Sequence, residues 1–287
     1  MIKNKNFKLL LFIFLGLFCL AAGNTESWRE KKSEHFIVYF TQDESFAQDV
    51  LNAAEKDYRR IAHDLGYARY SEFWTWDKRV KIYIHPDRES FLKATGQPSW
   101  SEGMADYTNK QIVSYVWGKD FIESLLPHEI AHLVFRDFVG FVGQIPLWLD
   151  EGVAQWEEEA KRSNMKKLIQ RYYQQDNLLL ISDIMKLNIE HLKDKQGVLI
   201  RATRTKDGKD GVLFLSANNL VEIYYLQSVA LVGYLIEKYG SQAFSGFCRE
   251  LRDGKNVEEA LKVAYPLHIR SLQEFEDGWR EYLKAGS

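Results

Sequence analysis

The pattern of apolar and polar residues in the first part of the chain predicts a small mixed unit. Four segments either alternate between apolar and polar residues or are rich in β-branched and aromatic residues, as strands are. They are Phe36–Phe40, Arg79–Ile84, Gly103–Tyr107 and Gln111–Trp117. Between the first two, apolar residues recur at helical spacing from Ser45 to about Leu65, and Gly66 follows as a stop. We therefore expect residues 30–118 to form an α+β unit with a mostly antiparallel sheet.

Beyond residue 118 the pattern is mainly helical, because apolar residues recur at intervals of three and four. The approximate helical ranges are Ser124–Phe138, Leu147–Arg162, Met165–Gln175, Leu220–Tyr239, Ser241–Asp253, Val257–Val263 and Ile269–Leu283. The exception is Val198–Ser216, which alternates around a turn-like segment and predicts a β-hairpin or a mobile flap. The expected fold is thus α+β, with a cleft between a mixed N-terminal half and a helical C-terminal half.

The N-terminus carries a separate signal. Lys3, Lys5 and Lys8 precede an uncharged run from Leu9 to Gly23 that ends in small residues. A basic start, a short apolar run and a small-residue exit are typical of a secretory signal peptide. The run is shorter than the roughly 20 residues that span a bilayer as a helix. We expect residues 1–23 to direct export to the periplasm or the medium, with an uncleaved membrane anchor as the alternative.

With that segment set aside, the predicted divisions are residues 24–118 for the α+β subdomain and 119–287 for the helical subdomain. The formal net charge of −2 and the scattered basic residues lack the electrostatic footprint of a nucleic-acid binder. Cys248 is then the only cysteine, so we expect no internal disulfide. Stability must come from the apolar core and from any metal that the chain binds.

The segment with the clearest chemistry is Leu126–Phe135, which reads LPHEIAHLVF. His128 and His132 are four residues apart, so on a helix their imidazoles lie on one face and can reach one metal ion. Glu129 follows the first histidine and can approach a water molecule at the metal without being a ligand itself. The apolar residues around these three fit a helix that is buried on its other faces, where polar groups require a reason to be present.

A third ligand is expected from the segment Trp148–Ala154, which reads WLDEGVA. A loop between two helices can bring the carboxylate of Glu151 back to the two histidines, and Gly152 leaves the backbone room for a close approach. Two histidines and one carboxylate leave an open tetrahedral position, which is typical of catalytic rather than structural zinc. Asp150 is the alternative carboxylate, although on a helix it points about 100° away from Glu151.

These motifs resemble those of the gluzincin branch of metallopeptidases, and especially those of the small bacterial peptidase MA-like proteins. The resemblance extends from about Phe36 to Gly240, with HEIAH and WLDEG as its specific parts. It implies a thermolysin-like α/β subdomain packed on a helical one, with zinc in the cleft between them. It also implies that His128, His132 and Glu151 are the zinc ligands and that Glu129 is the general base.

Two weaker matches accompany these motifs. The stretch from Tyr224 resembles a Tyr-x-Gln-Ser helix in related proteins, which implies that Tyr225 helps to stabilise the oxyanion, with Tyr224 as the alternative and a core tyrosine as the plain interpretation. Gly103–Tyr107 (GMADY) lies where aminopeptidases of this branch carry Gly-x-Met-Glu-Asn. This chain has Asp106 and Tyr107 there, so the amine-binding glutamate of an exopeptidase is not evident.

The expected activity is hydrolysis of a peptide or protein substrate, with no nucleic acid partner and no membrane contact once the signal peptide is removed. One Zn²⁺ per chain would activate water and polarise the scissile carbonyl, and Glu129 would move the proton to the leaving amine. Three alternatives stay open. They are a zinc hydrolase that acts on a non-peptide amide, an inactive zinc-binding module, and a metal-free protein whose histidines serve a hydrogen-bond network.

Overall fold

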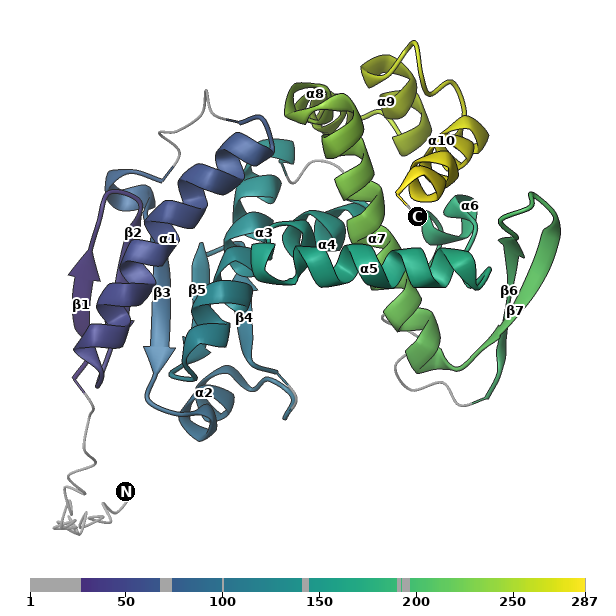
Figure 1. Ribbon diagram of the computed structural model, residues 1–287. Helices are drawn as coiled ribbons and strands as arrows, with labels where there is room; N and C mark the ends of the chain where they lie inside the picture. The colour runs from purple at the N-terminus through teal and green to yellow at the C-terminus, as the bar shows by residue number, and fades with distance from the viewer. Residues whose placement is uncertain are drawn as a thin grey trace, which may run out of the picture.

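The computed structural model describes residues 27–67, 74–99, 101–140, 145–189, 192 and 197–286. The expected signal peptide, residues 1–23, lies outside these residues. The described chain is a mixed α+β structure, as the sequence predicted, in which a five-stranded sheet is followed by a series of helices. Figure 1 shows the sheet at one end of the molecule and a two-stranded hairpin at the other.

The sheet consists of β1 to β5 in the spatial order β1-β2-β3-β5-β4. The strand bounds are β1 Arg29–Lys32, β2 Phe36–Phe40, β3 Val80–His85, β4 Gly103–Asp106 and β5 Gln111–Tyr115. The expectation of a mostly antiparallel sheet is wrong, because the two central pairings, β2 with β3 and β3 with β5, are parallel. Only the outer pairs, β1–β2 and β4–β5, are antiparallel.

The parallel centre follows from the helix between β2 and β3. A parallel pair needs a crossover connection of a dozen or more residues, and α1 (Glu44–Asp64) supplies it. The inward residues of β2 and β3, including Phe36, Val38 and Ile82, are fully buried, and α1 packs its apolar face against this part of the core. Three short helical segments complete this part of the chain. The 3-10 helix η2 (Trp76–Lys78) precedes β3, α2 (Arg88–Thr95) connects β3 to β4, and the π-helix η3 (Phe121–Leu125) follows β5.

The remaining helices form the second part of the molecule. They are α3 Leu126–Val139, α4 Leu147–Trp156, α5 Glu159–Gln174, α6 Ile181–Ile184, α7 Ala217–Tyr239, α8 Ser241–Arg252, α9 Val257–Ala264 and α10 Leu272–Ala285. The prediction of one helix over Leu147–Arg162 is wrong, because α4 ends at Trp156 and α5 begins at Glu159. Glu158 between them has a non-helical backbone with ψ 72°, and both Glu157 and Glu158 are held by partners from other helices.

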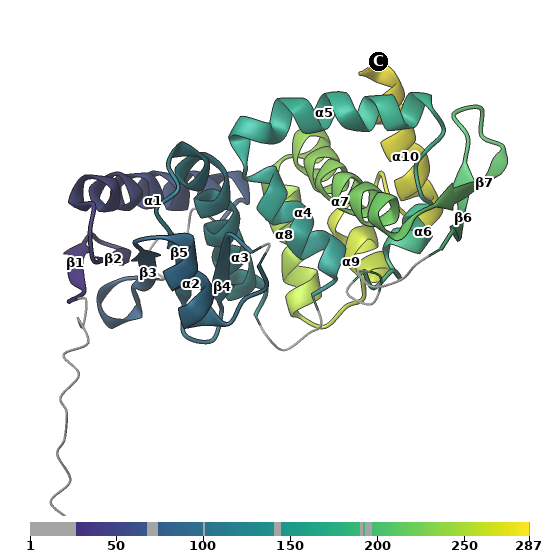
Figure 2. The same cartoon turned by 90° about the horizontal axis from the view of Figure 1, so that it is seen from below.

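The central helix α7 packs against α4, α5 and α8, and Figure 2 shows α5 and α7 side by side. Among the residues that the structure describes, α7 alone is long and apolar enough to cross a membrane, but 67% of its most apolar window is buried inside the protein. That burial identifies it as a core helix. The segment before α7 is the hairpin of β6 (Leu199–Arg204) and β7 (Asp210–Leu215), so the predicted hairpin is confirmed. One of its faces is exposed and apolar, with Ile200 opposite Phe214.

Gly152 permits the close contact between α4 and α7. A Cβ atom at this position would lie 2.6 Å from the carbonyl oxygen of Ser228 and 2.8 Å from a methyl group of Val232. The contact is reciprocal, because a Cβ at Gly233 on α7 would lie 2.4 Å from the ring of Trp156 on α4. The two glycines therefore determine how closely α4, which carries Glu151, packs against α7.

Replacing Gly152 with alanine is expected to lower the free energy of unfolding by about 1–3 kcal/mol, which is the usual cost of overpacking against atoms that cannot move aside. Chemical denaturation of the metal-free protein measures this change. Gly246→Ala on α8 is the matched control, because the only atom near its added Cβ is the end of the flexible Arg249 side chain, at 3.8 Å. A Gly152→Ala variant as stable as the control variant would contradict the close approach of the two helices.

Candidate metal centre

Helix α3 presents the two histidines of the HEIAH motif on one side. The helix starts with Pro127 in its first turn, and its other faces are filled by fully buried residues such as Ile130 and Phe135. His128 is half-buried and His132 is 4% exposed. Their Nε2 atoms lie 3.2 Å apart, as expected for imidazoles one helical turn apart that point at a common position.

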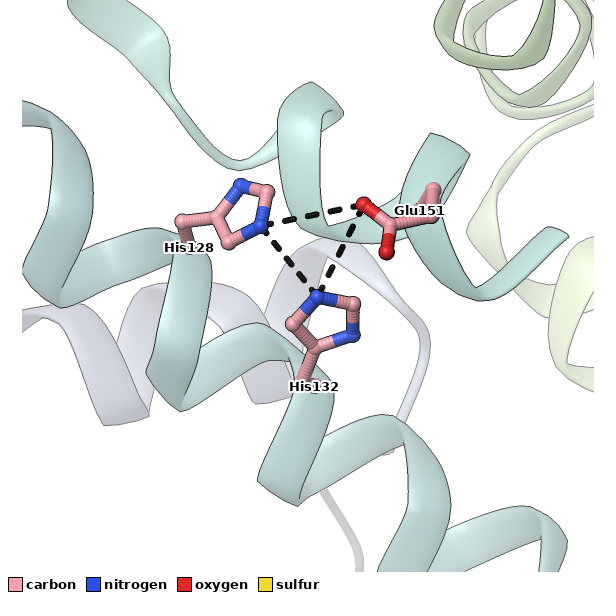
Figure 3. A group of neighbouring side chains, drawn as sticks. All are labelled: His128, His132 and Glu151. Atoms are coloured by element: carbon pink, nitrogen blue, oxygen red, sulfur yellow. Dashed lines mark hydrogen bonds and ion pairs between the residues drawn. The ribbon is translucent and has the colours of Figure 1, made fainter. Parts of the chain in front are cut away.

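Helix α4 brings Glu151 to the same position. Its Oε2 atom lies 3.9 Å from the Nε2 of His128 and 4.0 Å from the Nε2 of His132, as Figure 3 shows. These three residues are the group that can hold a metal ion within the described part of the chain. Zinc bonds of about 2.0–2.1 Å in a tetrahedron separate the ligand atoms by roughly 3.3 Å, so the observed separations need only small adjustments to fit zinc.

Each histidine is fixed through its other ring nitrogen. The Nδ1 of His128 lies 2.9 Å from Oε1 of Glu158, and the Nδ1 of His132 lies 3.0 Å from Oδ1 of Asp150. Because an ionised carboxylate only accepts hydrogen bonds, both Nδ1 atoms donate, and in the neutral, metal-binding form of each ring Nε2 would present its lone pair toward Glu151 and the other histidine. Three electron-pair donors that face one point, with the two histidines oriented from behind by carboxylates, are the donor set of a cation site.

The supporting carboxylates are themselves held in place. Asp150 is 2% exposed and accepts hydrogen bonds from Arg136, whose Nε donates to both carboxylate oxygens and whose Nη2 donates to Oδ2 at 2.5 Å. The guanidinium group of Arg136 also stacks over the ring of Tyr107, 3.9 Å from its centroid. Glu158 is 6% exposed and accepts from Ser124 at 2.5 Å, while the ammonium of Lys161 lies 2.6 Å away. Neither carboxylate is free to turn away from its histidine.

The charges at the site match this arrangement. Burial opposes ionisation of Glu158, but its interactions with His128, Lys161 and Ser124 together outweigh burial and lower its pKa to about 2. The pKa of Asp150 is likewise lowered, against the effect of burial, by His132 and Arg136. Burial alone would lower the pKa of His132, yet the carboxylates of Asp150, Glu151 and Glu129 raise it to about 9. The surroundings therefore favour a positive charge at the position where the three donors meet.

Glu129 is a buried carboxyl group among the charged groups of the site. It is 8% exposed, and burial raises the pKa of its carboxyl group, while the nearby charges of His128 and His132 act in the opposite direction. A carboxylate with a raised pKa binds and releases a proton closer to neutral pH than an exposed glutamate does. Glu129 lies beside His128 in the sequence and close enough to His128, His132 and Glu151 for their charges to act on its carboxyl group.

Three tyrosines lie in the region of the site. Tyr224 is 1% exposed, and burial, Tyr225 and Glu151 together raise its pKa, so its hydroxyl lies within electrostatic range of the third donor. Tyr225 is half-buried beside it, with ring centroids 5.9 Å apart, and its role as an oxyanion donor stays a prediction. Tyr107, which follows β4, lies edge-on to His132 at 6.0 Å. Burial and the charges of Asp150 and Glu129 raise its pKa.

The sequence pattern did not identify Arg136 or Glu158 as site residues, and it identified Tyr107 only as part of the GMADY segment. Arg136 follows His132 by one helical turn, so the spacing that identified the histidines also places it next to them. No comparable signal identifies Tyr107, because it reaches the site through sheet pairing. The carboxylate of Asp106 accepts hydrogen bonds from the backbone of Thr108 and Asn109, so it serves the turn after β4.

Comparison with protein families yields one match. The family model of the peptidase MA superfamily matches residues 211–285, which begin in β7 and extend through α7 to α10. No curated protein matches the chain. The match agrees with the resemblance seen in HEIAH and WLDEG, although it covers a different part of the chain, and it supports a metallopeptidase-type activity on peptide or protein substrates. Peptidases of this superfamily are typically metal-dependent, which fits the group formed by His128, His132 and Glu151.

Proposed function

We propose that this chain is a zinc-dependent metallopeptidase of the gluzincin type, with His128, His132 and Glu151 as the zinc ligands. The observation that carries the proposal is the convergence of these three donors, with two of them oriented from behind by buried carboxylates. The match of residues 211–285 to the peptidase MA superfamily supports the class of reaction. We also propose the thermolysin-like arrangement, in which the substrate binds between the sheet part and the helical part.

The roles of the residues follow from their positions. Zinc, when bound, would lower the pKa of water and polarise the scissile carbonyl. Glu129 accepts the proton of the attacking water, since burial raises its pKa, and delivers that proton to the leaving amine. Glu158 and Asp150 hold the two imidazoles in the tautomer that directs Nε2 to the metal. Tyr225 is proposed to donate a hydrogen bond to the oxyanion.

The proposal extends to where the protein acts. The basic start, apolar run and small-residue exit of residues 1–23 support export, so the substrate would be a peptide or protein outside the cytoplasm. A hydrolase of non-peptide amides could use the same zinc chemistry, and a panel of amide and peptide substrates separates the two. An inactive zinc-binding module is disfavoured by the buried Glu129, because a site that only binds metal has no use for a proton acceptor there.

The test is the metal content of the full chain, purified without chelators and measured by elemental analysis. We expect about one zinc per chain in the wild type and none in His132→Ala, because the variant loses one of three ligands. Peptide hydrolysis should stop on chelation and return when zinc is added. A wild type that takes up no zinc from excess would refute the proposed function and leave the histidines as members of a hydrogen-bond network.

A further inference from the structure

The structure points to Arg60, on α1, as a positioning residue for the metal site. We propose that Arg60 binds the two residues that flank Glu158 at the junction between α4 and α5. These contacts keep the Glu158 carboxylate at hydrogen-bond distance from Nδ1 of His128. The inference rests on the proposed function, since it concerns the affinity of the site for zinc. Arg60 belongs to the part of the molecule that carries the sheet, whereas Glu158 and His128 belong to the helices that follow it.

Arg60 contacts the two residues that flank Glu158. Its Nη1 atom donates to Oε2 of Glu157 at 2.5 Å, and its Nη2 atom donates to the backbone carbonyl of Glu157 at 2.9 Å. Its Nε atom lies 3.3 Å from Oε2 of Glu159. One planar guanidinium therefore makes two hydrogen bonds to Glu157, before Glu158, and an ion pair without a hydrogen bond to Glu159, after it. A lysine, with a single charged atom, cannot make these contacts together.

The junction is held from α1 as well as from its own helices. Glu157 and Glu158 lie between the last residue of α4, Trp156, and the first residue of α5, Glu159, and no side chain caps the start of α5. The side chain of Arg162 on α5 donates two hydrogen bonds to the carbonyl oxygen of Trp156, so Arg60 adds the hold on Glu157. Glu157 is completely buried, and burial raises the pKa of its carboxyl group while the charge of Arg60 opposes the rise. A buried carboxylate needs a paired cation, so the position of Glu157, and with it the backbone at Glu158, follows the position of Arg60.

Arg60 affects the metal site through the side chain of Glu158. Glu158 reaches His128 only because the chain leaves helical geometry at this residue, with φ −77° and ψ 72°. If the junction relaxed into the continuous helix that the sequence pattern favours, the Glu158 side chain would turn away from His128. Residues that orient a ligand histidine typically contribute 10–100-fold to metal affinity. Arg60 acts on His128 indirectly, because it holds the backbone that positions Glu158.

The experiment measures the zinc dissociation constant of the full chain by competition with a chromophoric chelator. We expect Glu158→Gln to weaken zinc binding by about 10–100-fold and Arg60→Met by roughly tenfold. The double variant should bind zinc no more weakly than Glu158→Gln alone, because Arg60 acts through Glu158. Arg60→Lys keeps a cation for Glu157 and so protects folding, and it should still weaken zinc binding because it cannot hold both flanking residues.

The matched control is Arg280→Met. Arg280 is also a nearly buried arginine that pairs with a glutamate, Glu276, and donates to a backbone carbonyl, that of Arg204, but it has no contact with the ligand helices α3 and α4. It should lower the melting temperature of the metal-free protein without changing the zinc dissociation constant.

Three results would overturn the inference or its basis, each in a different way. Folded Arg60→Lys and Arg60→Met variants that bind zinc as tightly as the wild type would show that Arg60 has only a structural role. A double variant in which the two losses multiply would show that Arg60 does not act through Glu158. A wild type that binds no zinc would instead refute the proposed function itself, and the Arg60 inference with it.

Discussion

Replacing Glu129 with glutamine is expected to reduce the turnover of a peptide substrate by about 10²–10⁴-fold, which is the usual contribution of a general base. Zinc content and melting temperature should stay at the wild-type values. The physical reason is that glutamine keeps the size and one hydrogen-bonding oxygen of glutamate but cannot take up a proton. Removing a buried carboxyl group whose pKa is raised by burial also relieves a desolvation cost, so the variant should fold well.

The measurement is kcat for a peptide substrate of the wild type, alongside elemental analysis of both proteins. Glu123→Gln is the matched control, because Glu123 lies on the segment just before α3 but is exposed. The Glu123→Gln substitution makes the same chemical change on the segment before α3 and should leave kcat unchanged. Near-native hydrolysis by Glu129→Gln would contradict the assignment of the base, whereas loss of zinc from that variant would indicate that Glu129 holds the metal directly.

The elements that the sequence predicted well are those in which local pattern and tertiary packing agree. The β2 segment consists of β-branched and aromatic residues and the β3 segment alternates, and in both strands one face is buried. The buried residues of α7 and α8 follow helical spacing. The meeting of His128, His132 and Glu151 could be foreseen because one helical turn fixes the first pair and WLDEG is the next buried helix along the chain. In each case a few residues contain the necessary information.

The features that sequence reasoning missed depend on contacts between distant segments. Strand β1 reads REKK, which has no strand pattern, and it pairs with β2 as an exposed edge. The helix predicted between the β2 and β3 segments was the signal for a parallel pair that the expectation of a mostly antiparallel sheet overlooked. The parallel pairing of β3 with β5 had no such local signal, because β4 lies between them in the sequence and pairs on the other side of β5. The break between α4 and α5 is of the same kind, because Arg60 and His128 capture two glutamates in a stretch of high helix propensity.

The identity of the carboxylate ligand gives the second large effect. Glu151→Gln should weaken zinc binding by more than the roughly 10–100-fold expected when a residue only supports a ligand, whereas Asp150→Asn should stay within that range. The reason is geometric. Glu151 Oε2 lies 3.9 and 4.0 Å from the two Nε2 atoms that face the metal position, while Asp150 lies behind the imidazole of His132, 3.0 Å from its Nδ1.

The two substitutions form a matched pair, since each removes one negative charge from adjacent residues of α4 and keeps the shape of the side chain. Competition with a chelator gives the two zinc dissociation constants, and peptide hydrolysis at saturating zinc provides a second readout. At saturation Asp150→Asn should recover most of its activity, because its Oδ1 can still accept from His132. If Asp150→Asn lost more zinc affinity than Glu151→Gln, Asp150 would be the ligand and α4 would have to rotate by about 100° on binding the metal.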